Sequence, residues 1–116
     1  MTAEKTTITH DGETLTLEAA RYSDNGALAL VLVVESTGEL YNSITVNIPG
    51  TFMFDPEYDV ILDTNNNSAE LLQLVIDTGL VEDSNYTQNR SGFCVYPVHS
   101  LTEKGIAWVK EQLDEE

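Results

Sequence analysis

The chain is short of positive charge. It has 5 Lys and Arg residues against 20 Asp and Glu residues, which gives a formal net charge of −15 over 116 residues. Proteins that bind nucleic acid directly neutralise its phosphates with Lys and Arg, so this balance excludes ordinary nucleic-acid binding. The same charge opposes an anionic membrane surface, and no stretch approaches the ~18 apolar residues of a membrane helix. We expect neither nucleic acid nor a membrane as a direct partner.

Cysteine is also scarce. Cys94 is the single cysteine, so no internal disulfide can form, whereas secreted domains more often carry an even number of cysteines. Residues 1–10 lack the basic segment and the apolar run of a signal peptide. The sequence therefore predicts a cytoplasmic protein. The apolar run 93–96 contains Cys94 with no acid or base beside it, which predicts that this thiol packs in the core.

The apolar content is sufficient for one packed domain. Hydrophobic residues make up 41% of the chain, which argues against disorder. A chain of this length can bury about two-thirds of its unfolded surface around a single core. We predict a single domain over residues 1–116.

Turn signals divide residues 1–62 into β-strands. The pairs Asp11-Gly12, Asn25-Gly26 and Thr37-Gly38 separate runs that are rich in β-branched and apolar residues. Such short connections predict a four-stranded antiparallel meander. Residues 58–62 are the candidate for a fifth strand.

Two of these runs also predict their surroundings. Residues 27–34 have no polar position, so we expect the third strand to lie centrally with both faces covered. Residues 40–48 alternate between apolar and polar side chains. This alternation predicts a fourth strand with one buried face, which includes Leu40, and one wet face.

Helical spacing begins near residue 67. Asn67 followed by Glu70 resembles a helix start, and Gly79 stands where a helix end is expected. We predict a helix over about 68–78, followed by a polar loop over 82–92.

The remaining residues predict a strand and a second helix. Residues 93–96 form a short strand that Pro97 stops, because proline cannot donate to a β-ladder. Ser100 and Glu103 form a second capping pattern, which starts a helix over about 101–113. The fold class is then α+β, an antiparallel β-meander of four to five strands with two helices packed on one face.

Patterns that bind metals are incomplete in this sequence. His10 and His99 have no partner at zinc-binding spacing, and His99 is expected at the surface. The acids over 55–63 resemble the start of a calcium loop, but Val60 and Asn66 stand where Gly and Glu are needed. We expect no metal, no cofactor and no enzymatic activity.

The unpaired acids are the candidate binding site. Five bases cannot neutralise them, so the folded chain carries a repulsion that a basic partner would relieve. Carboxylates in such a cluster can imitate the phosphates of DNA, although acidity that serves only solubility is the alternative. The predicted partner-binding residues are Glu35, Glu39, Asp55, Glu57, Asp59 and Asp63.

Several aromatic residues lie among these acids. They are either interface anchors or core residues, and their spacing favours the core. The residues concerned are Tyr41, Tyr58, Tyr86 and Trp108.

Four segments, 22–30, 44–49, 63–66 and 91–97, resemble the signature blocks of a family known as domain of unknown function 4313. The resemblance covers residues 15–96, and the helix after Pro97 is expected to be an extension of the family pattern. It implies a small acidic protein of phages and mobile elements, and it supplies no catalytic residues.

The resemblance and the charge together predict a non-enzymatic binding protein. Small acidic proteins of mobile elements include inhibitors of host defence, and some are DNA mimics that block CRISPR nucleases. The expected partner is the basic surface of a host nucleic-acid-handling defence complex. The alternative is an accessory protein that self-associates through sheet edges or the C-terminal helix, as a homo-oligomer.

Overall fold

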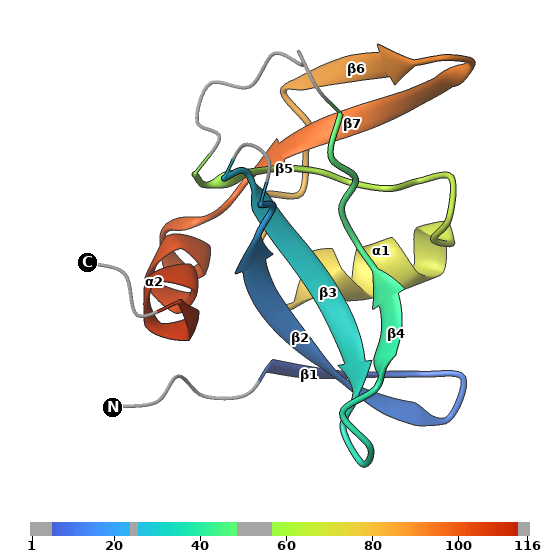
Figure 1. Ribbon diagram of the computed structural model, residues 1–116, viewed down its shortest axis with the longest axis vertical. Coiled ribbons are helices and arrows are strands. Elements are labelled where there is room, and N and C mark those ends of the chain that lie inside the picture. The colour runs from blue at the N-terminus through green and yellow to red at the C-terminus, as the bar shows by residue number, and fades with distance from the viewer. Residues whose placement is uncertain (1–5, 24–25, 49–56, 114–116) are drawn as a thin grey trace.

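A computed structural model describes residues 6–23, 26–48 and 57–113 of the chain. These residues form two antiparallel sheets and two helices, so the predicted α+β fold class is confirmed (Figure 1). The first sheet has the order β1-β2-β3-β4 and consists of β1 (Thr6–His10), β2 (Glu13–Arg21), β3 (Leu28–Val34) and β4 (Leu40–Ser43). The second sheet has the order β5-β7-β6 and consists of β5 (Asp59–Ile61), β6 (Thr87–Ser91) and β7 (Cys94–Ser100). The helices are α1 (Ala69–Asp77) and α2 (Glu103–Gln112).

The first sheet is the predicted four-stranded meander. Its first turn is Asp11-Gly12, with φ angles of 50° and 80°, between the paired residues His10 and Glu13. Two positive φ angles define a type I′ turn, whose twist matches that of the flanking strands. The turn dipeptide therefore fixes the register of the hairpin.

β3 lies centrally, but its two faces are covered unequally. Leu30 and Leu32 are completely buried, whereas Val31 and Val33 on the opposite face are partly exposed. The prediction that both faces are covered is therefore wrong for these outer positions.

β4 differs from the prediction because of a β-bulge. Val33 pairs with Leu40 but Leu32 pairs with Asn42, so the register shifts between them. One extra residue reverses the faces of all residues beyond it. Leu40 therefore joins the outer face of the sheet, where it is 65% exposed instead of buried.

The segment after β4 joins the two sheets. The Ile44 amide donates to the Leu30 carbonyl of β3 at 2.9 Å, and the Val46 amide donates to the Ile61 carbonyl of β5 at 3.0 Å. The fourth strand therefore ends at Ser43 instead of near residue 48, and the following residues pass from one sheet to the other. The fifth strand, β5, exists, but it pairs with β7 instead of extending the meander.

The second sheet contains two departures from the prediction. β6 lies in the segment predicted to be a polar loop. β7 continues through Pro97, whose carbonyl accepts a hydrogen bond from the Leu62 amide at 3.0 Å. The carbonyl and amide sites of one residue face the same neighbouring strand, and β5 ends at Ile61 on that side. The missing N–H of Pro97 therefore removes only a bond to the Leu62 carbonyl, one residue beyond the end of β5, and none on the β6 side.

Both helices begin at caps other than the predicted ones. The Ser68 hydroxyl accepts from the Leu71 amide at 3.1 Å, and the Thr102 hydroxyl accepts from the Gly105 amide at 3.0 Å. Ser100 is instead the last residue of β7. The predicted helices are confirmed, whereas the predicted N-caps, Asn67 and Ser100, are wrong.

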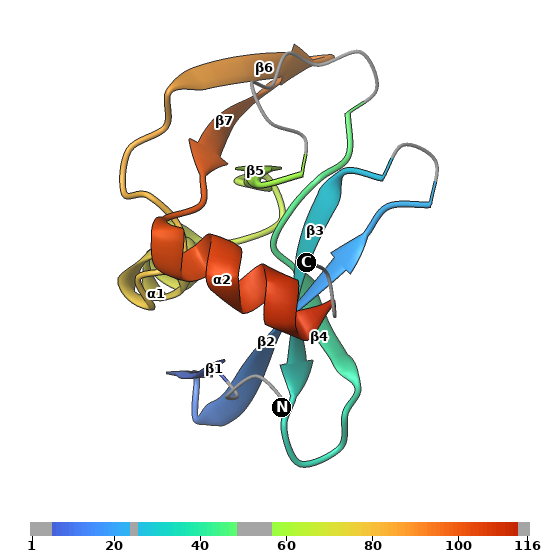
Figure 2. The ribbon, with the colours of Figure 1, turned by 90° about the vertical axis from the view of Figure 1, so that its left-hand side faces the viewer.

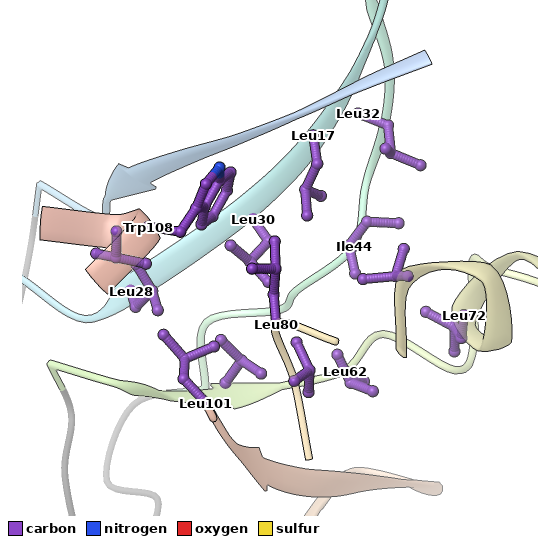
Figure 3. Close-up of a cluster of buried hydrophobic side chains, with 14 of the residues drawn as sticks. Leu17, Leu28, Leu30, Leu32, Ile44, Leu62, Leu72, Leu80, Leu101 and Trp108 are labelled. Atoms are coloured by element: carbon purple, nitrogen blue, oxygen red, sulfur yellow. The ribbon is translucent and has the colours of Figure 1, made fainter. Parts of the chain in front are cut away.

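The core fills the space between the first sheet, both helices and β5. Leu28, Leu30 and Leu32 of β3 point into it, and Trp108 of α2 approaches from the side (Figure 3). α2 lies over the first sheet in the view of Figure 2. Trp108 is 8% exposed, which confirms its predicted place in the core.

The aromatic residues near the acids also pack against buried clusters. Tyr41 and Tyr58 contact the main core, and Tyr86 contacts a smaller cluster formed by Ile61, Tyr96 and Val98. The core interpretation of these residues is confirmed.

Candidate binding surface

Two of the predicted partner-binding acids are buried. Asp59 is 4% exposed and accepts a hydrogen bond from the Tyr86 hydroxyl, while Asp63 is 6% exposed. The Asp63 carboxylate accepts from the backbone amides of Asn65 and Asn66 at 3.2 and 3.1 Å. A carboxylate that satisfies local amides in this way stabilises a turn. The expectation that Asp59 and Asp63 lie on the surface is therefore wrong.

Glu57 is exposed, but positive groups lie beside it. Its backbone carbonyl accepts from the Arg21 guanidinium at 2.6 Å. Arg21 and Lys110 both lie near the ring of Tyr58, at 5.8 and 6.0 Å from its centroid. Asp55 lies outside the described residues. The region around Glu57 is therefore of mixed charge.

Glu35 and Glu39 belong to a distinct acidic surface. They lie in the turn between β3 and β4, and the Glu35 amide donates to the Thr14 carbonyl of β2 at 3.0 Å. This bond places the turn beside the β1–β2 turn, which contains Asp11 and leads into Glu13 of β2, in the lower part of Figure 1. We call the four exposed residues Asp11, Glu13, Glu35 and Glu39 the acidic end.

The acidic end contains a shallow depression, lined by Glu13 and Glu35 with Gly12, Thr14 and Ser36. Among the described residues, no lysine or arginine forms an ion pair with Glu13, Glu35 or Glu39. Their carboxylates therefore repel one another without local compensation.

The described cations lie elsewhere. Arg21 ends β2 at the opposite end of the first sheet, and the Lys104 ammonium donates to the Thr78 carbonyl at 3.1 Å. Arg21 and Lys104 therefore do not lie at the acidic end.

Glu35 and Glu39 are among the predicted partner-binding residues, whereas their neighbours Asp11 and Glu13 are not. The topology contains the signal, since the first and third turns of a meander lie at the same end of the sheet. A predicted meander could therefore have grouped these four acids.

The two histidines have different environments. His99, expected at the surface, is 6% exposed, and its Nδ1 lies 2.9 Å from the Glu82 carbonyl oxygen. His10 Nδ1 lies 3.6 Å from a Glu70 carboxylate oxygen. Within residues 6–23, 26–48 and 57–113, no three His, Cys, Asp or Glu side chains are grouped so that they could hold a metal ion.

Cys94 packs partly buried in the smaller cluster. A hydrogen bond with its side chain, together with desolvation, raises the pKa of the Tyr96 hydroxyl above its ordinary value. The phenol therefore stays protonated at neutral pH, and Tyr96 is not available there as a base.

None of the helices in the described residues has the length and apolar character needed to span a bilayer.

The fold and the acidic end together define a class of small α+β proteins with a negatively charged surface at the turns of a β-meander. A family model described as "Domain of unknown function (DUF4313)" matches residues 16–115, and the chain belongs to this family. The match includes α2, so the expectation that this helix extends beyond the family pattern is wrong. Neither the curated proteins nor the solved structures gave a match.

Proposed function

We propose that this protein is a non-enzymatic binding protein whose acidic end engages a basic protein surface. The partner is a host nucleic-acid-handling defence complex in the cytoplasm, and the protein acts as a DNA mimic encoded by a phage or mobile element. The observation that carries the proposal is the grouping of Asp11, Glu13, Glu35 and Glu39 without a paired lysine or arginine among the described residues.

The geometry supports this function in two ways. The strand pairs that precede and follow the two turns fix the backbone that carries the carboxylates, so little backbone entropy is lost on binding. Duplex DNA carries one negative charge per ~1.7 Å of its axis, and a protein groove that binds it is lined with cations. The carboxylates of the acidic end can pair with such cations. Binding also relieves the repulsion within the acidic end.

Charge reversal at the acidic end tests the proposal. In the variant Glu13→Lys, Glu35→Lys and Glu39→Lys, we expect capture of DNA-binding proteins from a bacterial host lysate at low salt to be lost. The unchanged protein should retain its partner at low salt, release it at high salt, and compete with labelled duplex DNA for it, because screening weakens surface charge pairs.

A matched variant controls for net charge. Glu18→Lys, Asp83→Lys and Glu111→Lys reverse three exposed acids outside the acidic end and change the net charge equally. This variant should bind as the unchanged protein does. Equal loss in both variants, or binding that salt does not weaken, would contradict the proposal.

A second candidate function is self-association, which the β6–β7 hairpin favours. The tip of this hairpin projects at the top of Figure 1 and carries Phe93, which is fully exposed, and Val95, which is 42% exposed. Exposed aromatic residues are frequent anchors of protein interfaces. This surface differs from the sheet edges and the C-terminal helix expected from the sequence.

Phe93→Ser tests this second function. Gly92 has a φ of 63° at the first position of the two-residue turn, and serine is acceptable at the next position. We expect sedimentation equilibrium to show concentration-dependent dimers for the unchanged protein and monomers for Phe93→Ser. Leu40→Ser, which removes an exposed hydrophobic side chain elsewhere, should still form dimers. A constant monomer mass of the unchanged protein at all concentrations would contradict self-association.

A further inference from the structure

A recess of about 250 Å³ lies between α1 and the second sheet, away from the acidic end. Its floor is formed by buried side chains, chiefly Leu62 and Leu72, together with His99. Thr64 and Gln73 are exposed and form its rim. The recess therefore combines an apolar interior with access to solvent, which is the usual form of a small-molecule site.

The polar side chains that line the recess differ in whether they can still form a hydrogen bond with a ligand. The Asn67 amide donates to the carbonyls of Ser43 and Asp63 at 2.9 and 3.0 Å, and its oxygen accepts from the Asn42 amide at 2.6 Å. Asn67 is thus occupied by the protein itself.

One ring nitrogen of His99 has no hydrogen-bond partner among the described residues. Its Nδ1 faces the Glu82 carbonyl, which can only accept, so Nδ1 carries the proton of the neutral ring. Nε2 is then an acceptor, and no described residue bonds to it. Nε2 is not one of the buried unpartnered atoms of the described residues, so solvent reaches it, and a ligand with a donor can replace the water that bonds to it.

We propose that this recess binds a small molecule with an apolar body of one ring and one hydroxyl or amine donor, which bonds to Nε2 of His99. The volume equals about eight water molecules at ~30 Å³ each, which matches a single ring with a short substituent. The net charge of −15 disfavours anionic ligands. This binding is independent of the acidic end and of the function proposed for it.

Three probes of similar size test the proposal on the full chain by amide chemical-shift mapping. Phenol supplies the donor, toluene lacks it, and benzoate carries a negative charge. We expect phenol to shift the amides of Ala69, Leu72 and His99 with a millimolar Kd, about tenfold tighter than toluene, as one hydrogen bond provides. Benzoate should cause no saturable shift. Equal affinities for phenol and toluene would overturn the proposal.

Two variants separate the hydrogen bond from the cavity. His99→Phe should bind phenol and toluene equally, whereas the matched variant His10→Phe should keep the tenfold preference. Ala69→Trp places a large side chain into the recess from its exposed side, and this variant should bind neither probe. It provides a second test in case His99→Phe does not fold. Unchanged phenol binding by Ala69→Trp would overturn the proposal. A second outcome would also overturn it. If the amides at the recess shift with protein concentration when no probe is present, and Phe93→Ser abolishes these shifts, then a second copy of the chain fills the recess.

Discussion

Gly105→Ala is expected to destabilise the protein by at least about 2 kcal/mol, although alanine stabilises most helix interiors by about 1 kcal/mol relative to glycine. A Cβ at this position of α2 would lie 2.0 Å from the Leu80 carbonyl oxygen and 3.2 Å from the Leu101 Cβ. The first contact is with backbone, which cannot move aside as a flexible side chain can. The steric cost therefore exceeds the gain in helix propensity.

Urea unfolding followed by circular dichroism measures this loss. We expect the midpoint for Gly105→Ala to fall by about 1 M or more, given a typical slope of about 1–3 kcal/mol per M. The control is Ala107→Gly on the exposed side of the same helix, which should cost only about 1 kcal/mol. A midpoint for Gly105→Ala that stays the same or rises would show that α2 does not approach Leu80 so closely.

Asn67→Leu is expected to cost about 3 kcal/mol despite the similar size of the two side chains. Asn67 is 7% exposed and connects the end of β4 to the turn before α1 through the carbonyls of Ser43 and Asp63. Leucine would leave these two carbonyls without their Asn67 donor, and each unsatisfied buried group costs about 1–3 kcal/mol, whereas the partly exposed Asn42 amide would keep its bond to the Asn66 carbonyl.

Thermal and urea unfolding of Asn67→Leu should be compared with Asn42→Ala. The latter removes a partly exposed partner and leaves the two Asn67 donor bonds intact, so we expect a loss of about 1 kcal/mol. Equal stabilities of the two variants would contradict the role assigned to Asn67.

The elements that sequence analysis predicted correctly are those that local chemistry determines. Asp11-Gly12 can adopt two positive φ angles, and so it fixes both the first turn and its register. The apolar face of α1 and the glycine after it likewise act within a few residues. Such signals are complete in the sequence itself.

The elements that it missed depend on pairing between distant residues. β6 has the sequence TQNRS, without alternation, and becomes a strand because β7 lies beside it. The bulge that exposes Leu40 arises from the pairing of β4 with β3, which the alternating pattern does not encode. Tertiary context overrides local preference at these positions.

The candidate site divides in the same way. Charge is visible in the sequence, but the environment of each carboxylate is not. Asp63 was indistinguishable from Glu35 until the turn at Asn65 and Asn66 showed that its oxygens are used internally. Grouping Glu35 with Glu13 required the topology of the meander and no further information.

The bonds of Ile44 and Val46 to both sheets have a consequence for how the molecule responds to a partner. With one short segment shared between them, neither sheet can open without breaking hydrogen bonds of the other. The two sheets should therefore unfold in one cooperative transition. Binding at the acidic end would then raise the melting temperature of the whole body and slow amide exchange as far away as β7, without any change of shape there.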